Sequence, residues 1–302
     1  MRVIITGGTG LIGSALAKSL LADGHEVIVL SRNPGSAKIE PGVRIENWTA
    51  RSGDGWSSLI TSDTAIINLA GAGIGDKRWS EDRKKLILES RVNAGAAVVD
   101  AIEKASEKPR VVIQSSAVGY YGTPGDQILT EDSPAGDDFQ ADVCKQWEDS
   151  TKTVEGMEVR RVVIRSGVVL SMDGGAFPRM LLPFKLMVGG PIGNGSHWFP
   201  WIHIDDEIKA IRFLIENEGA KGVFNVMAPN PLTNGDFTHE VGKIMQKPAV
   251  IPVPKLALQL MFGEMAIILI EGQRAIPKRL QEHNFEFVYP TVEPALKNLF
   301  KK

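Results

Sequence analysis

The chain has 302 residues, long enough for one large domain or two lobes, with 43% hydrophobic and 23% charged residues. This composition is typical of a globular protein with a sizeable core, and the net charge of −2 gives no support to binding nucleic acid or an acidic membrane. The chain has one cysteine, Cys144, which cannot form an intrachain disulfide, so a reducing, cytoplasmic setting is expected. No signal peptide is expected before the first strand.

The first thirteen residues predict a phosphate-binding turn. A short apolar run at residues 3–5 leads into Gly7, Gly10 and Gly13, and a helix-compatible segment follows. Such glycines let the backbone turn sharply, approach a pyrophosphate and pack a helix on a strand. The helix N-terminus adds free N–H groups and a partial positive charge. A second strand at residues 26–30 completes a βαβ unit, which favours a dinucleotide site over a glycine turn that binds nothing.

The end of the second strand predicts which nicotinamide cofactor is bound. Ser31 and Arg32 stand where an acidic residue would accept hydrogen bonds from a ribose 2′-hydroxyl. An arginine offers a fork of donors that matches a 2′-phosphate, and Ser31 adds a hydroxyl. NADP(H) is therefore the expected cofactor, and the alternative is a solvated loop arginine.

Two further elements are expected at the cofactor. The strand at residues 64–69 ends in small residues, so Leu69, Ala70 and Gly71 are candidates to line the site at the carboxyl edge of the sheet. A long helix is predicted from about residue 80 to 104. Most of its charges are expected to be solvated, but Arg91 has apolar neighbours and is expected to point inward toward the phosphates.

The rest of the chain alternates strands and helices, and no metal-binding spacing is present. A buried strand ends in Ser115 and Ser116, and Lys145 lies on a later helix.

Asp205 is expected to cap the helix at residues 207–215, and the glycine-rich residues 189–195 are expected to form a flexible lid. Apolar helices are expected at residues 177–188 and 255–273. The apolar stretch at 256–270 is interrupted by Gln259 and Glu264, which makes it too short and too polar for a membrane span, and it is expected to be a buried helix.

The chain resembles the extended short-chain dehydrogenases/reductases, a nucleotide-sugar-epimerase-like superfamily. The motifs that carry this resemblance are TGGTGLIG at 6–13, NLAG at 68–71, Ser115-Ser116 with Tyr121-Gly122, Lys145, and WIHIDD at 201–206. It is more narrowly similar to atypical "epimerase family" proteins, through VCKQWE at 143–148, RSGVVL at 165–170, FPWIHI at 199–204 and EGQR at 271–274.

The resemblance implies an α/β Rossmann fold, a doubly wound parallel sheet with a small, mostly helical C-terminal substrate lobe. Residues 1–170 and 199–226 would form the NADP-binding domain, and residues 171–198 and 227–302 the smaller lobe. Together with the glycine turn, it predicts these cofactor-binding residues: Gly7, Thr9, Gly10, Leu11, Ile12, Gly13, Ser31, Arg32, Leu69, Ala70, Gly71, Arg91, Ser115, Lys145 and Val168.

The chain departs from the superfamily at two catalytic positions. The superfamily's acid/base tyrosine stands four residues before the active-site lysine, where this chain has Ala141 before Lys145. The superfamily's catalytic hydroxyl residue would fall on Ala117. The remaining catalytic candidates are Lys145, Tyr121, Ser115 and Ser116, with Tyr120 or a histidine at residues 198–203 as other sources of a proton.

Three functions stay open from the sequence. The first is an NADP(H)-dependent reductase or epimerase acting on a carbonyl or sugar-like substrate with a relocated acid. The second is an NADPH-binding sensor or regulatory protein without hydride chemistry. The third is an interaction protein with a vestigial pocket. The expected partners are a small-molecule substrate and a second copy of the chain, with no nucleic acid and no membrane.

Overall fold

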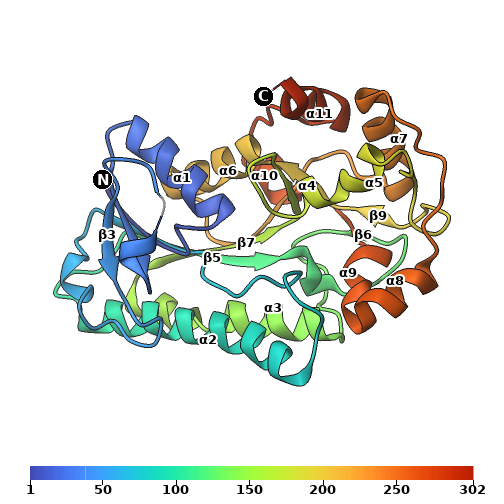
Figure 1. The fold of residues 1–302 in the computed structure, drawn as a ribbon. Coiled ribbons are helices and arrows are strands. Elements are labelled where there is room, and N and C mark those ends of the chain that lie inside the picture. Colours follow the sequence, from blue (N-terminus) through green and yellow to red (C-terminus); the bar gives the residue numbers. More distant parts are fainter. Residues whose placement is uncertain (38, 302) are drawn as a thin grey trace.

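The computed structural model describes residues 1–37 and 39–301, with only the backbone at Ser36. Its centre is a seven-stranded, fully parallel sheet (Figure 1). The strands, in order across the sheet, are β3 (Arg44–Asn47), β2 (Glu26–Ser31), β1 (Arg2–Thr6), β4 (Thr64–Asn68), β5 (Val111–Ala117), β7 (Arg160–Ser166) and β11 (Gly222–Val226). This order confirms the predicted doubly wound Rossmann fold.

The sheet is buried on both faces, and its sequence explains why. Val3, Ile4 and Ile5 of β1 are fully buried and point alternately to the two sides. Val3 and Ile5 pack in one hydrophobic cluster with Leu16, whereas Ile4 packs in the other with Val98. A continuous apolar run therefore supplies both faces of the central strand.

Helices cover each face (Figure 1). One face carries α1 (Leu11–Ala22) and α6 (Ile204–Glu216), and the other carries α2 (Glu81–Lys104) and α3 (Phe139–Asp149). Strand order reverses at β1, which pairs with β2 on one side and with β4 on the other. The helices that follow β1 and β4 thus leave the sheet toward opposite faces, and a ligand crevice forms at this point.

Shorter elements complete the chain, mostly in its second half. The helices are α4 (Phe177–Met180), α5 (Leu182–Lys185), α7 (Asn234–Met245), α8 (Lys255–Phe262), α9 (Ile267–Ile270), α10 (Lys278–Glu282) and α11 (Val292–Lys301). The short strands are β6 (Ile128–Leu129), β8 (Val168–Leu170), β9 (Trp198–Phe199), β10 (Trp201–His203), β12 (Leu232–Thr233) and β13 (Arg274–Ala275). Short 3₁₀ helices span Pro34–Ser36, Ser57–Leu59, Val118–Tyr121, Lys152–Met157 and Gly263–Ala266.

These later elements have a hydrophobic cluster of their own. Phe177 of α4, Phe237 of α7 and Leu296 of α11 pack together in it, apart from the clusters on the sheet. The carboxylate of Asp206 on α6 ties the C-terminal segment to the sheet side, because it accepts the backbone N–H groups of Val288 and Tyr289 at 2.7 and 2.8 Å. The predicted domain boundaries at 170, 198 and 226 stay a prediction.

Two predicted helices are broken. The segment 177–188 forms two four-residue helices, with Pro183 at the start of the second. The predicted buried helix at 255–273 is also wrong, because α8 ends at Phe262 and α9 is only four residues long. Gly263 lies between them in a left-handed conformation (φ +62°) that a helix cannot continue. Leu260 on α8 is 72% exposed, so this helix is not buried.

Two local predictions are corrected as well. The residues expected to form a flexible lid are held by parallel bridges, Gly189 to Ala249 and Ile192 to Val253. The cap of α6 is His203 rather than Asp205, because the His203 ring Nδ1 accepts the backbone N–H of Asp205 at 3.0 Å. In the described residues we find no helix whose length and apolar content would let it cross a membrane.

Candidate dinucleotide-binding cleft

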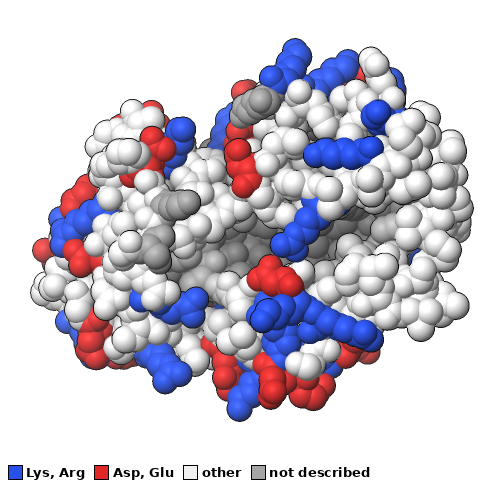
Figure 2. All heavy atoms as spheres, viewed as in Figure 1, with Lys and Arg blue, Asp and Glu red and all other residues white. Residues whose placement is uncertain are grey.

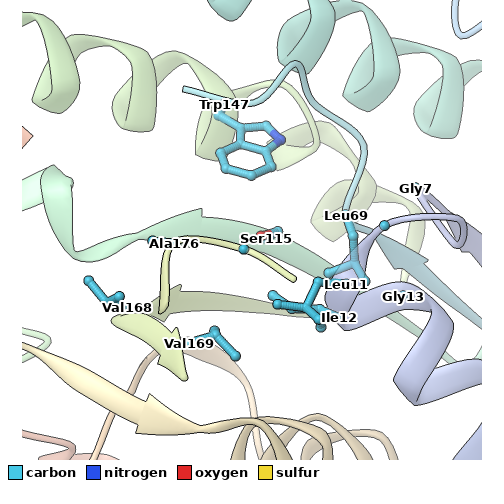
Figure 3. Close-up of a pocket in the computed structure, with 12 residues that line it drawn as sticks. Gly7, Leu11, Ile12, Gly13, Leu69, Ser115, Trp147, Val168, Val169 and Ala176 are labelled. Atoms are coloured by element: carbon cyan, nitrogen blue, oxygen red, sulfur yellow. The ribbon is translucent and has the colours of Figure 1, made fainter. Parts of the chain in front are cut away.

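A cleft of about 360 Å³ opens at the carboxyl ends of the central strands (Figure 3). Its volume lies in the range of cofactor and ligand sites. Figure 3 shows Trp147 from α3 on one side and Val168 and Val169 from β8 on the other. The lining residues are Gly7, Gly10, Leu11, Ile12, Gly13, Leu69, Ser115, Trp147, Val168, Val169, Gly175 and Ala176.

The three glycines of the turn have different physical requirements. Gly7 has φ +70°, and a Cβ there would lie 2.8 Å from the carbonyl carbon and oxygen of Leu69. A Cβ at Gly13 would lie 2.5 Å from the Gly7 oxygen. A Cβ at Gly10 would meet only the Gly7 oxygen, at 3.3 Å, so Gly10 is open on the side of the cleft. Gly7 and Gly13 are needed by the fold, whereas Gly10 leaves room for a ligand.

The start of α1 supplies hydrogen-bond donors to this cleft. Gly10 is the N-cap residue and has no capping side chain. The first bond at the helix start runs from the Ser14 N–H to the Gly10 oxygen, at 2.9 Å. The N–H groups of Leu11, Ile12 and Gly13 therefore have no acceptor within the helix. Together with the helix dipole they form a site suited to a pyrophosphate.

A row of buried polar side chains fixes the strand ends beneath the cleft. The Thr6 hydroxyl donates to Asn68 Oδ1 at 2.6 Å, and the Asn68 amide donates to Gln114 Oε1 at 2.9 Å. All three side chains are fully buried. Thr6 also accepts the N–H of Ala70 at 3.3 Å, which fixes the backbone beside Leu69. Sequence analysis did not identify this row, although each residue is a polar position in an apolar strand.

The predicted 2′-phosphate residues lie at the end of β2, outside the lining of the cleft. Ser31 is the last residue of the strand, and its hydroxyl accepts the N–H of Asn33 at 3.2 Å. Arg32 and Thr9 are exposed. Strand β2 pairs directly with β1, the strand that leads into the glycine turn. Arg32 follows the last residue of β2 and so lies at the same edge of the sheet as that turn.

Arg91 points inward, and its predicted contact with the phosphates stays a prediction. Its guanidinium lies over the Trp147 ring, with Cζ 4.7 Å from the centroid, and donates to the carbonyls of Ala72 and Ile87 at 2.9 Å. A Cβ at Gly71 would come within 3.0 Å of Arg91 Cζ. Burial lowers the pKa of Arg91 to about 10. The side chain thus backs the wall of the cleft rather than lining it.

Ser115 is the only one of the four proposed catalytic residues that lines the cleft. The neighbouring Ser116 is 3% exposed, and its hydroxyl donates to Glu148 Oε1 at 2.6 Å. Lys145 is half-buried on α3, one turn after the fully buried Ala141.

Tyr121 is held in a buried network away from the cleft. Its hydroxyl donates to Asn225 Oδ1 at 2.7 Å and accepts from Arg165 at 3.1 Å. Arg165 also makes a two-pronged ion pair with Glu148, at 2.8 and 2.9 Å. Burial raises the pKa of Tyr121 to about 12. This geometry gives no support to Tyr121 or Ser116 as proton donors, because both hydroxyls already donate to buried acceptors.

Four lining residues were missed by sequence analysis: Trp147, Val169, Gly175 and Ala176. Trp147 stands in the VCKQWE motif, two residues after Lys145, which is the signal that could have identified it. Its indole nitrogen is buried, without a hydrogen-bond partner among the described residues. Gly175 lies close to the start of α1, since a Cβ there would be 3.0 Å from Leu11 Cδ2.

The sheet order, the glycine turn and the cleft define a dinucleotide-binding protein of the extended short-chain dehydrogenase/reductase class. The NAD dependent epimerase/dehydratase family matches residues 3–145, and a domain of unknown function (DUF1731) matches residues 253–299. The chain belongs to the epimerase family that includes SDR39U1.

Relatives match along the whole chain. It is 40% identical over 304 residues to "Epimerase family protein SDR39U1 homolog, chloroplastic" of Arabidopsis thaliana, covering 100% of this chain and 87% of the relative. It is 39% identical over 300 residues to "Epimerase family protein YfhF" of Bacillus subtilis, covering 99% and 98%. The crystal structure of human SDR39U1 with NADPH has a TM-score of 0.90 and 38% identity, with each chain covered completely.

Proposed function

We propose that this chain binds NADP(H) in the cleft and uses it as a reductase or epimerase on a carbonyl or sugar-like substrate. The observation that carries the proposal is the phosphate cradle, in which Gly10 is open to the cleft beside three free N–H groups at the start of α1. The NADPH in the human relative supports the same cofactor that Arg32 predicts.

The residues present fit a dinucleotide along the edge of the sheet. The N–H groups of α1 would hold the pyrophosphate, and Arg32 with Ser31 the 2′-phosphate. Leu69, Ala70 and Gly71 would give the cofactor a close approach to the backbone. Val168, Ser115 and Lys145 would face the nicotinamide half. Figure 2 shows a hollow across this face of the molecule, with both basic and acidic side chains at its edges.

We propose Ser115 as the residue that donates a proton to the substrate or accepts one from it. When bound, the nicotinamide would give a hydride to, or take one from, a substrate carbon. The substrate oxygen then needs a hydroxyl or ammonium partner, and Ser115 is the catalytic candidate on the lining of the cleft. Lys145 would stabilise negative charge on that oxygen, or on the Ser115 oxygen once Ser115 has given up its proton.

A specific observation favours a second candidate function, an NADPH-binding protein without hydride chemistry. Ala141 is fully buried where the superfamily places its tyrosine, and no tyrosine lines the cleft of the described chain. Such a protein would bind NADPH as tightly but turn over no substrate.

One experiment separates the two functions. NADPH binding is measured by calorimetry, and NADPH absorbance is then followed against a panel of carbonyl and nucleotide-sugar substrates. The enzyme proposal expects turnover that falls at least tenfold in Ser115→Ala and in Lys145→Ala, with NADPH still bound. Tight NADPH binding with no turnover on any substrate would favour the sensor.

A further inference from the structure

A short segment connects two parts of the cleft lining that lie far apart in the sequence. Residues 73–78 stand between β4 and α2, and Leu69, which lines the cleft, lies four residues before them. Their contact in the second half of the chain is α4, which starts one residue after Ala176, another lining residue. Four of the six residues are exposed. We call residues 73–78 the strap.

Both ends of the strap are fixed to the helices that cover the sheet. Before it, the Ala72 N–H donates to Ser90 Oγ and the Ala72 oxygen accepts from Arg91, both at 2.9 Å. After it, the Trp79 ring packs edge-on against Phe139 of α3, with 4.9 Å between the ring centroids. Because the ends are held, any motion of the strap is confined to its middle.

The middle of the strap is held to the second half of the chain by weak contacts. Arg179 Nη1 on α4 donates to the Gly75 oxygen at 3.4 Å, which is long for a hydrogen bond, and Arg179 is exposed. Gly75 also lies against α9, since a Cβ there would be 3.7 Å from Ile268 Cδ1. The Arg78 side chain lies against Gly263, where a Cβ would be 2.8 Å from its Nε. A long, exposed hydrogen bond and two side-chain contacts cost little to break.

We propose that the strap is a gate over the cleft, closed by the contacts of Gly75 with Arg179 and Ile268, and that it opens when NADP(H) enters or leaves. This inference rests on the proposed function, because NADP(H) is the ligand that the gate admits. Glycines at 73 and 75 give the backbone on both sides of Ile74 the freedom that such a motion requires. Figure 1 shows α4 above the sheet and α2 below it, and Figure 2 shows a hollow between them.

Stopped-flow kinetics of NADPH binding and release, followed by NADPH fluorescence, test the gate. Arg179→Ala and Ile268→Ala loosen the closed strap in the free and the bound protein alike. We therefore expect the association and dissociation rate constants to rise together, by about threefold or more, with Kd changed by less than about twofold. Loss of a direct contact with NADPH would instead raise only the dissociation rate constant and weaken Kd. Lys185→Ala is the matched control, because Lys185 is an exposed cation on the next helix, α5, and bonds no part of the strap in the described chain.

A second variant holds the strap closed. In Gly75→Cys with Ile268→Cys, a short bifunctional methanethiosulfonate can join the two new thiols, and Cys144 is buried and should not react. The joined protein should bind and release NADPH about tenfold more slowly or less readily still, and a reductant should restore both rates. Gly75→Cys alone, treated in the same way, should keep the rates of the wild type.

The possible failures point to different errors. Unchanged rates in both alanine variants and in the joined protein, with NADPH still bound, would overturn the gate and leave the proposed function standing. A rise in the dissociation rate constant alone would also overturn the gate, and would make Arg179 or Ile268 a contact of the ligand. A wild type that does not bind NADPH would contradict both the proposed function and the gate.

Discussion

The guanidinium of Arg91 lies over the indole ring of Trp147, 4.7 Å from its centroid, and so holds that ring on the wall of the cleft. Arg91 is fixed in turn by the carbonyls of Ala72 and Ile87. Figure 3 shows the Trp147 ring on the side of the cleft opposite Val168 and Val169.

This relationship predicts that Trp147 reports cofactor binding. NADPH should quench the fluorescence of the wild type by energy transfer from Trp147, and Trp147→Phe should lose most of this change. The loss of ring contact should weaken NADPH binding about threefold to tenfold, as a stacking contribution of about 0.5–1.5 kcal/mol implies. Trp48→Phe is the control, because Trp48 is buried in the sheet's own cluster. An unchanged quench in Trp147→Phe would contradict the placement.

The glycines of the turn should separate ligand binding from folding. An alanine at position 10 can adopt the φ of −83° that Gly10 has, so Gly10→Ala should unfold at the same temperature as the wild type. Its Cβ would stand in the cleft, so we expect NADPH to bind at least tenfold more weakly, a loss of about 1.4 kcal/mol in binding free energy. Gly13→Ala forces a Cβ to 2.5 Å from the Gly7 oxygen and should lower the free energy of unfolding by about 1–3 kcal/mol. Equal effects of both changes on unfolding would refute this division of roles.

The Glu148–Arg165 pair should be needed for stability. Both side chains are buried, and Arg165→Met would leave the Glu148 carboxylate without its guanidinium. We expect the free energy of unfolding in urea to fall by about 3–5 kcal/mol. Lys85→Ala, which breaks an exposed pair with Glu89 on α2, should leave it nearly unchanged. Similar effects of the two substitutions would contradict the account of this network.

Glu207 on α6 should make stability depend on pH. It is fully buried, accepts a hydrogen bond from Ser166 at 2.7 Å, and its pKa is raised by burial from 4.5 to about 8. The neutral carboxyl is favoured in the fold, so the stabilisation is complete below pH 4.5 and is lost as the pH rises through 8. Glu207→Gln should therefore unfold less readily than the wild type at pH 9, by on the order of 3 kcal/mol. An identical pH dependence in the two proteins would exclude this role.

The sequence predicts the sheet better than the second half of the chain, for physical reasons. The strands of an all-parallel sheet are apolar runs, as at residues 3–5 and 64–69, and the glycine turn fixes where the doubly wound fold begins. Hydrophobic periodicity does not show that Gly263 breaks the helix after Phe262, because its left-handed conformation depends on tertiary contacts. The same limit applies to residues 189–195, whose glycines look flexible but are held by residues 249–253.

The site could be predicted only in part. The glycine turn, Leu69, Ser115 and Val168, which pattern and resemblance predict to bind the cofactor, line the cleft. Their contact with the cofactor stays a prediction. Trp147 was missed because the VCKQWE motif at 143–148 marks α3 but does not show which of its side chains face the cleft. The role of Tyr121 could not be predicted, because its hydroxyl bonds to Asn225 and Arg165, and both residues are far from Tyr121 in the sequence.

Calorimetry of the wild type with NADPH and with NADH tests whether the cleft is built for NADP(H). We expect NADPH to bind at least tenfold more tightly, and Arg32→Ala to remove most of this preference while leaving NADH affinity unchanged. Equal affinity for the two cofactors, or binding of neither, would contradict an NADP(H) site in this cleft.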